Sequence, residues 1–210
     1  EPADSQEAYD MVKAAFALSE EYNTPVLLRL TTRVCHVKAV VQIGERQDVA
    51  ITGFKPDARR WVMTPANAKG RLPEQIAREG KLQALAESSA LNVLEPGSDR
   101  RIGFVTSGPS YMHVRECFPD APVLKLGFTY PVPMALVEKL ADQVDRIVVV
   151  EETEPLMEQE IRAAGVKNLH GKDLLPRLGE LTPNVLIPAI KGFLGEPIPP
   201  TTTYPKFDPF

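Results

Sequence analysis

The 210-residue chain is poor in cysteine and has no apolar run of membrane-spanning length. Cys35 and Cys117 lie far apart and outside any Cys-x-x-Cys pattern, so the sequence predicts neither a disulfide framework nor a cysteine-rich metal site. Two isolated thiols are typical of a reducing compartment, and we expect a cytoplasmic protein. Because an apolar stretch of about 20 residues and a signal peptide are both absent, we expect no contact with a membrane.

The sequence also lacks an excess of basic residues. The 24 Lys and Arg residues face 28 Asp and Glu residues, which gives a formal net charge of −4. Nucleic-acid binding depends on basic surfaces that displace counterions from phosphates, so we expect no nucleic-acid partner. The length is sufficient for one or two domains with hydrophobic cores of their own, without stabilising metals or disulfides.

Residues 1–44 have the pattern of a helix followed by a strand. Asp4 and the polar residues after it can cap a helix that ends near Asn23, and the almost continuously apolar stretch Val26 to Leu30 predicts a buried strand. This is half of a parallel α/β unit, and the chain begins at Glu1 without a methionine. We therefore expect residues 1–44 to be the C-terminal part of a domain that begins in a longer protein.

Residues 45–99 have weaker periodicity and predict a connecting segment. We expect a strand over Gln47 to Phe54 and a helix from about Leu72 to Ser89. Phe54, Trp61 and Val62 are large apolar residues, which favours an ordered segment that buries them.

Residues 100–195 alternate regularly between apolar strands and amphipathic helices. The predicted strands are 102–106, 122–126, 146–150 and 166–169, the predicted helices are 109–117, 133–142 and 155–164, and a last apolar segment covers 184–192. This spacing predicts an α/β fold with a doubly wound parallel sheet covered on both faces. The proline-rich tail, 196–210, cannot continue a helix and is expected to be extended.

The turn after the first of these strands is a candidate binding site. Gly103 and Gly108 have the spacing of a phosphate loop, but Pro109 and Ser110 stand where that loop requires lysine and a hydroxyl. Open α/β sheets bind ligands beyond the carboxyl ends of their strands, so Thr106 and Ser107 remain candidates for a contact.

Three carboxylates, Glu151, Glu152 and Glu154, follow the third strand of the regular part. They could be a general acid and base, but they also precede a helix that begins at Pro155. Negative charge is favourable at a helix N-terminus, and we favour this structural role over catalysis.

Two further loops contain unusual residues. The stretch from Arg29 to His36 brings Arg33 and His36 together directly after the predicted strand of residues 26–30, while Phe128 and Tyr130 lie in a glycine- and proline-rich loop after the strand 122–126. Loops at this edge of α/β folds often have functional roles. No pair among the three histidines has the spacing of metal ligands.

Several motifs, in order, resemble one known family. They are EPADSQEAYDMVKAAFALSEEYNTPVLLRLTTRVCH, FKPDARRWVMTPANAK, TSGPSY, LKLGFTYPVP, VVVEETEPLMEQEI and GKDLLPRLGELTP. The chain resembles the alpha subunit of indolepyruvate ferredoxin oxidoreductase, a 2-oxoacid:ferredoxin oxidoreductase. The resemblance implies the end of a pyrimidine-type thiamine-enzyme domain, a linker, and an α/β domain similar to the transketolase C-terminal domain.

The same resemblance implies an activity for the whole enzyme. That enzyme oxidatively decarboxylates indolepyruvate and other arylpyruvates to acyl-coenzyme A, uses thiamine diphosphate, Mg²⁺ and 4Fe-4S clusters, and has a beta subunit and ferredoxin as partners. The family's cofactor-activating glutamate, its Gly-Asp-Gly motif and its cysteine clusters have no counterpart in this chain.

We therefore expect a non-catalytic fragment that binds none of these cofactors by itself. No catalytic, cofactor-binding or metal-binding residue is assigned, and Arg33, His36, Thr106, Ser107, Phe128 and Tyr130 are candidates for an interface or for facing the active site. An alternative is a freestanding flavodoxin-like module that binds a small molecule or a partner. A third interpretation, another thiamine enzyme such as a transketolase, agrees less well with the order of the motifs.

Overall fold

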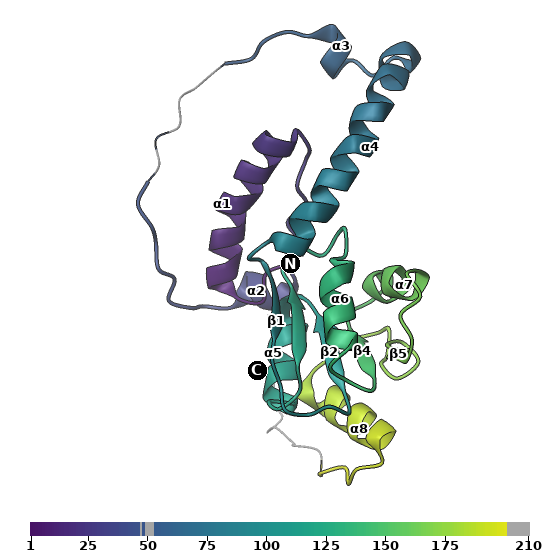
Figure 1. Cartoon of the computed structure of the whole chain (residues 1–210). Helices are drawn as coiled ribbons and strands as arrows, with labels where there is room; N and C mark the ends of the chain where they lie inside the picture. Colours follow the sequence, from purple (N-terminus) through teal and green to yellow (C-terminus); the bar gives the residue numbers. More distant parts are fainter. Residues whose placement is uncertain (47, 49–52, 201–210) are drawn as a thin grey trace.

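The computed structural model describes residues 1–46, 48 and 53–200. A sheet with helices on both faces forms the lower half of the molecule in Figure 1, and helices α1 and α4 stand above it. Residues 37–46 leave the region of α1 as an extended segment, and residues 53–64 lie near the far end of α4. The predicted strand at 47–54 and the proline-rich tail lie mostly outside the described residues.

Helix α1 covers Ser5–Tyr22, as its capping pattern predicts. The Asp4 side chain accepts a hydrogen bond of 2.8 Å from the Glu7 amide, and the Glu7 carboxylate accepts one of 2.8 Å from the Ala3 amide. This reciprocal arrangement satisfies amides that the first helical turn leaves without partners. The helix ends at Asn23, which adopts a left-handed conformation with a φ of 50°.

The sheet has the order β1-β3-β2-β4-β5. Its strands are β1 (Asn92–Glu95), β2 (Gly103–Thr106), β3 (Val123–Leu126), β4 (Ile147–Val150) and β5 (Leu169–His170). The pairs β2/β3, β2/β4 and β4/β5 are parallel, which confirms the predicted α/β class. The antiparallel edge strand β1 was not predicted, and it lies before residue 100, where the α/β domain was expected to begin.

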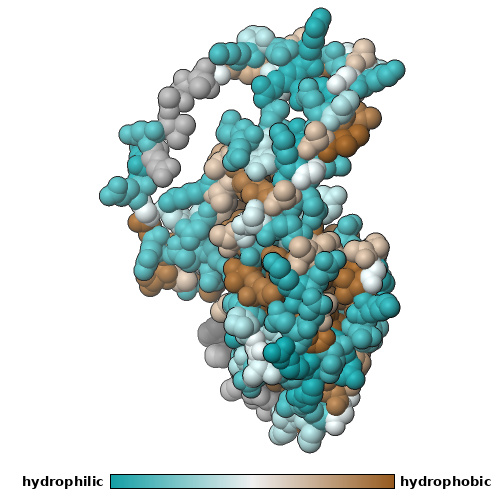
Figure 2. Space-filling view, viewed as in Figure 1, coloured by the Kyte–Doolittle hydropathy of each residue, from teal (hydrophilic) through white to brown (hydrophobic). Residues whose placement is uncertain are grey.

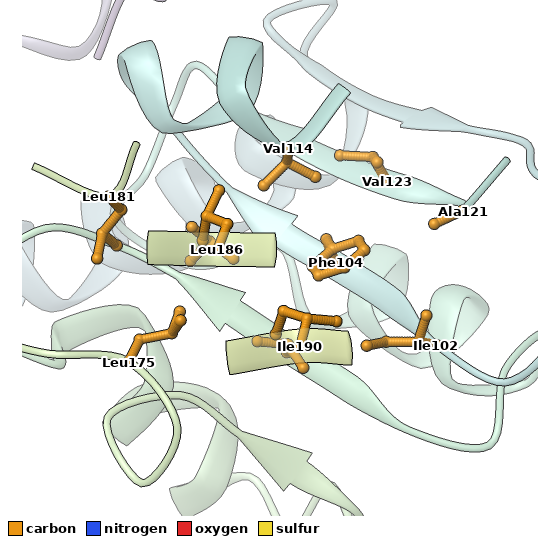
Figure 3. Close-up of a cluster of buried hydrophobic side chains, with 11 residues drawn as sticks. Ile102, Phe104, Val114, Ala121, Val123, Leu175, Leu181, Leu186 and Ile190 are labelled. Carbon is orange, nitrogen blue, oxygen red and sulfur yellow. The ribbon is translucent and has the colours of Figure 1, made fainter. Parts of the chain in front are cut away.

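Successive residues of β2 face opposite sides of the sheet, and this alternation organises the core. Phe104 packs on the face covered by α5 (Gly108–Cys117) and α8 (Pro183–Leu194), and Val105 packs on the face covered by α6 (Met134–Ala141) and α7 (Leu156–Ala163). Both side chains are fully buried. Figure 3 shows the first cluster, in which Leu186 and Ile190 of α8 lie over Phe104 and Ile102.

The end of the α/β unit differs in detail from the prediction. The predicted strand 166–169 is shorter and later, because Asn168 has a positive φ of 54°, which is incompatible with extended backbone. The predicted apolar segment 184–192 is helix α8, which has Pro183 in its first turn and is closed by Gly195 in the left-handed conformation.

The predicted buried strand from Val26 to Leu30 is wrong. This stretch has no regular secondary structure, and the Leu27 side chain is 91% exposed. No strand of the described residues lies beside it, and a strand requires a partner for its backbone groups. A short helix, α2 (Thr32–His36), follows it and buries Val34.

The connecting segment buries far less than predicted. Phe54, Trp61 and Val62 are 76%, 54% and 53% exposed, so their expected burial is wrong. Among the described residues of this segment, one turn of helix, α3 (Ala58–Trp61), precedes α4 (Pro65–Ser88). Helix α4 begins well before the predicted residue 72, because Pro65 suits the first turn and the Thr64 hydroxyl accepts from the Asn67 amide at 3.4 Å.

Exposed apolar groups are concentrated away from the sheet. In Figure 2, brown surface groups lie over α4 and over the extended chain beside the lower end of α1. Among the described residues, no helix combines the length and the apolar character needed to cross a membrane. The division into residues 1–44, 45–99, 100–195 and 196–210 remains a prediction.

Candidate functional site

The carboxyl ends of β2 and β4 form the crevice at which an open α/β sheet most often binds ligands. The two strands are neighbours, and the helices after them, α5 and α7, cover opposite faces of the sheet. The Thr106 hydroxyl at the end of β2 is buried and donates a hydrogen bond of 2.8 Å to the Val150 carbonyl. Thr106 therefore joins the two strand ends instead of facing solvent.

The chain's own N-terminal residues fill this crevice. The Ser107 hydroxyl donates to the Glu1 carboxylate at 2.6 Å, and the Glu1 backbone nitrogen donates to the Gly127 carbonyl, beyond the end of β3, at 2.7 Å. Arg29 forms an ion pair with the same Glu1 carboxylate. Ser107 is thus already engaged by a carboxylate of the first segment.

Gly108 shows how closely the first segment approaches the turn after β2. Its φ is +55°, and a Cβ added there would lie 3.7 Å from the Pro2 carbonyl oxygen. Residues 1–3 therefore pass directly over the N-terminus of α5, where the helix dipole favours the Glu1 carboxylate.

Helix α1 continues the contact along β3. Lys125 of β3 forms an ion pair with Glu7 and lies 4.5 Å above the ring of Tyr111. The Tyr111 hydroxyl donates to Glu95 at 2.6 Å, and burial together with this carboxylate raises the pKa of Tyr111 to about 12. These paired charges fix the register of α1 against the sheet.

Gly127 is the point of closest approach between α1 and the sheet. A Cβ at this position would lie 2.7 Å from both the Leu91 carbonyl oxygen and the terminal methyl group of Met11. Met11 is itself buried, with 4% of its surface exposed. Only glycine fits this contact without a shift of backbone.

Arg33 connects α2 to the loop before α8. Its guanidinium donates to both oxygens of the Glu180 carboxylate, at 2.9 Å and 2.6 Å. This pairing raises the pKa of Arg33 and lowers that of Glu180, and both side chains are largely exposed. Arg33 therefore joins α2 to the loop before α8, while the neighbouring His36 is exposed.

The loop after β3 contains the other two candidates. The Phe128 amide donates to the Asn92 side-chain oxygen at 2.9 Å, and the Phe128 side chain is half-buried. The Tyr130 side chain is 73% exposed. The structure thus places Thr106, Ser107, Phe128 and Tyr130 at one edge of the sheet, with Arg33 at the nearby end of α2.

Of the three carboxylates after β4, Glu151 has the structural role favoured from the sequence. Glu151 accepts hydrogen bonds of 2.9 Å from the amides of Met157 and Glu158, and burial raises its pKa. Glu154 forms an ion pair with Arg177. Glu151 therefore satisfies amides at the N-terminus of α7.

The described residues contain no cluster of side chains suited to an iron-sulfur centre or another metal ion. Within residues 1–46, 48 and 53–200, no group of three or more His, Cys, Asp or Glu side chains could hold a metal ion. Cys35 and Cys117 are both free thiols. No step of a reaction can be assigned to such a group in this chain.

Sequence reasoning missed the partners that make this edge an interface. These partners are three glutamates that lie far from their contacts in the sequence. Glu1 contacts Ser107 across 106 positions, Glu7 contacts Lys125 across 118, and Glu180 contacts Arg33 across 147. The one available signal was Lys125 itself, because a lysine inside an otherwise apolar strand requires a nearby carboxylate.

Comparison with known proteins gives a consistent match. A family model described as an indolepyruvate oxidoreductase domain matches residues 92–186, which begin at the first residue of β1. Indolepyruvate oxidoreductase subunit IorA of Methanothermobacter thermautotrophicus is 41% identical to the chain, over 94% of the chain and 34% of that protein. The IorA subunit of Pyrococcus horikoshii is 34% identical, over 95% of the chain and 33% of that protein.

The chain therefore spans about a third of the length of the curated relatives that it matches. Among solved structures, it is similar to the 2-oxoglutarate:ferredoxin oxidoreductase from Magnetococcus marinus with 2-oxoglutarate, coenzyme A and succinyl-CoA bound. The TM-score is 0.48 and the sequence identity 18%, over 83% of this chain and 29% of that chain.

Proposed function

Since this chain belongs to the family of indolepyruvate oxidoreductase subunit IorA, we propose that it is the structural, non-catalytic part of an arylpyruvate-oxidising enzyme. The whole enzyme oxidatively decarboxylates indolepyruvate and other arylpyruvates to acyl-coenzyme A and passes the electrons to ferredoxin. A beta subunit completes it, and its compartment is the cytoplasm. The observation that carries the proposal is the 41% identity to an IorA subunit over 94% of the chain.

In this enzyme, cofactors held by other parts of the protein carry out the decarboxylation and the electron transfer. Thiamine diphosphate with Mg²⁺ supplies the electron sink for decarboxylation, and 4Fe-4S clusters carry the electrons away. The residues of this chain hold the end of the first domain against the α/β unit. Three contacts hold them together: Ser107 with Glu1, Lys125 with Glu7, and Arg33 with Glu180.

The candidates for an interface or for facing the active site keep those roles in the proposal. Arg33, Thr106 and Ser107 lie at the contact between the first segment and the α/β unit. His36, Phe128 and Tyr130 lie beside it, with the Tyr130 and His36 side chains exposed. None of the six is proposed to hold a cofactor or a metal.

A freestanding ligand-binding module of flavodoxin-like shape is less well supported. In such a module, the crevice after β2 would receive the ligand. Here Ser107 is engaged by Glu1, and Pro2 covers Gly108. Exposure of the apolar stretch around Leu27 to water is also energetically unfavourable for a protein that functions alone.

Calorimetric titration with thiamine diphosphate and Mg²⁺ tests the proposal. We expect the complete enzyme to bind the cofactor and the 210-residue chain to show no binding at micromolar concentrations. Thermal unfolding of the chain alone, measured in parallel, verifies that the sample is folded. Micromolar binding to the isolated chain would overturn the proposal that other parts of the enzyme hold the cofactor.

A further inference from the structure

The loop Gly127–Pro133 is fixed to the end of helix α4 and to the residues just before and in β1. The Gln83 side chain donates to the Val132 carbonyl at 2.9 Å, and the Glu87 carboxylate accepts from the Ala135 amide at 3.0 Å. The Gly127 amide donates to the Leu91 carbonyl at 2.9 Å. In Figure 1, the lower end of α4 lies beside the upper end of α6, at whose start this loop ends.

Asn92 is the central residue of this support. It is buried, with 7% of its surface exposed, and its side-chain oxygen accepts from the Phe128 amide at 2.9 Å. Its side-chain nitrogen donates to the Ala86 carbonyl of α4, also at 2.9 Å. A single buried amide thus joins the helix to the loop, and the loop is held at both ends.

Between these fixed ends, the loop exposes one large aromatic side chain. Tyr130 is 73% exposed, whereas Val132, two residues later, is 4% exposed and belongs to the core. Within residues 92–194, all of which are described, Tyr130 is the one aromatic side chain that is largely exposed. A side chain on a loop that is already ordered loses little conformational entropy when it binds, so the arrangement favours recognition.

The position of the loop in the fold indicates which kind of ligand Tyr130 can contact. It leaves the carboxyl end of β3, at the edge where α/β sheets bind ligands. The neighbouring crevice after β2 is filled by residues 1–3, so the loop after β3 offers the accessible aromatic surface of this edge. A tyrosine ring is suited to pack against another ring in an offset or edge-to-face arrangement.

We propose that Tyr130 packs against the aryl group of the 2-oxo acid and determines specificity for aromatic substrates. Gln83, Glu87 and Asn92 are positioning residues that hold the loop in the shape this contact requires. The inference rests on the proposed function, because it takes the substrate class from there. It assigns to helix α4, within the connecting segment of residues 45–99, a specific part in substrate selection.

The test compares two substrates in the complete enzyme. For Tyr130→Leu, we expect kcat/KM for indolepyruvate to fall about two- to tenfold, the range that one aromatic pair contributes. For an aliphatic 2-oxo acid, 4-methyl-2-oxopentanoate, we expect a change of less than about twofold. Ile198→Ala removes an exposed apolar side chain after the end of α8 and should leave both values unchanged.

The positioning role has a matched pair of variants on one helix. Gln83 and Gln75 each donate to a glutamate four residues later, at 3.4 Å, but only Gln83 also holds the loop. Gln83→Ala should raise KM for indolepyruvate with little change in kcat, and Gln75→Ala should change neither. If both variants shift KM equally, the effect belongs to the helix and not to the loop.

The possible failures are distinguishable. If the wild-type enzyme does not turn over indolepyruvate at all, the proposed function is wrong. If the wild type does so but Tyr130→Leu lowers both substrates equally, or weakens subunit assembly in sedimentation velocity experiments, Tyr130 is a protein–protein contact and the specificity role is overturned.

Discussion

The α/β unit and the segment between helices α1 and α4 bury their apolar residues to very different extents. In the unit, Phe104 and Val105 are fully buried on opposite faces of one strand. In the segment, Leu27, Val40 and Phe54 are 91%, 98% and 76% exposed. Apolar content alone therefore does not make a core, because each region needs a surface of matching shape to cover it.

The largest expected difference is in the response to deleting an aromatic side chain. Phe104→Ala leaves a cavity between the sheet and α8, and we expect the free energy of unfolding to fall by about 3–5 kcal/mol. Trp61→Ala should change it by less than about 0.5 kcal/mol, since that ring is half exposed. Chemical denaturation measures both, and equal losses would contradict the contrast between the regions.

Alanine substitutions at two glycines should change the free energy of unfolding by smaller amounts, with opposite signs at the two positions. Gly127→Ala places a methyl group against the Leu91 carbonyl and Met11, so we expect destabilisation of about 1–3 kcal/mol. Gly80→Ala, in the middle of α4, meets nothing within 4 Å and should stabilise by about 0.5–1 kcal/mol. Denaturant midpoints measure both, and a neutral Gly127→Ala would show that α1 does not dock as described.

The pH dependence of stability should reveal the buried carboxylate of the α/β unit. Burial raises the pKa of Glu151 above its ordinary value of 4.5, so the folded state holds this proton more tightly than the unfolded state. The resulting stabilisation is fully present below pH 4.5 and is lost as the pH rises through the raised pKa.

We therefore expect wild-type stability to decline relative to Glu151→Gln as the pH rises above 4.5, measured by denaturation at a series of pH values. Glu154→Gln, on the same loop with a side chain 60% exposed, controls for the loss of a charge. Parallel curves for the wild type and Glu151→Gln would show that burial does not perturb this carboxyl group.

The smallest expected effect concerns the exposed link between the two regions. Arg33→Ala removes the paired hydrogen bonds to Glu180, and exposed ion pairs contribute about 0.2–1 kcal/mol. The loss should shrink in high salt, because exposed charges are screened. Arg46→Ala removes a pair with Asp48 that is about 90% exposed, and it should have no measurable effect. A salt-independent loss for Arg33→Ala would point to packing.

The sequence predicted the elements whose signals are local. Strand β2, helix α5, strands β3 and β4 and helix α7 were all recovered, because apolar periodicity and proline or glycine boundaries lie within each element. The stretch from Val26 to Leu30 has the same apolar signal without a neighbouring strand, so periodicity predicted a strand that does not form. An apolar pattern therefore indicates that a segment can be buried. Whether it is buried depends on a neighbouring strand or helix that covers it.

The contacts of the candidate site could not be predicted for a related reason. Ser107 meets Glu1 across 106 positions, and Arg33 meets Glu180 across 147. No local pattern links such residues, and only the family resemblance suggested an interface at this edge. Arg33 and Ser107 were candidates from the sequence, but the carboxylates opposite them required the fold.

Hydrogen–deuterium exchange of residues 26–46 tests most directly whether this chain is a structural part of a larger subunit. Exchange is measured in the isolated 210-residue chain and in the complete IorA-type subunit. We predict fast exchange of these amides in the isolated chain and strong protection in the complete subunit, with unchanged protection of β2 and β4. Equal exchange of residues 26–46 in both samples would contradict the account.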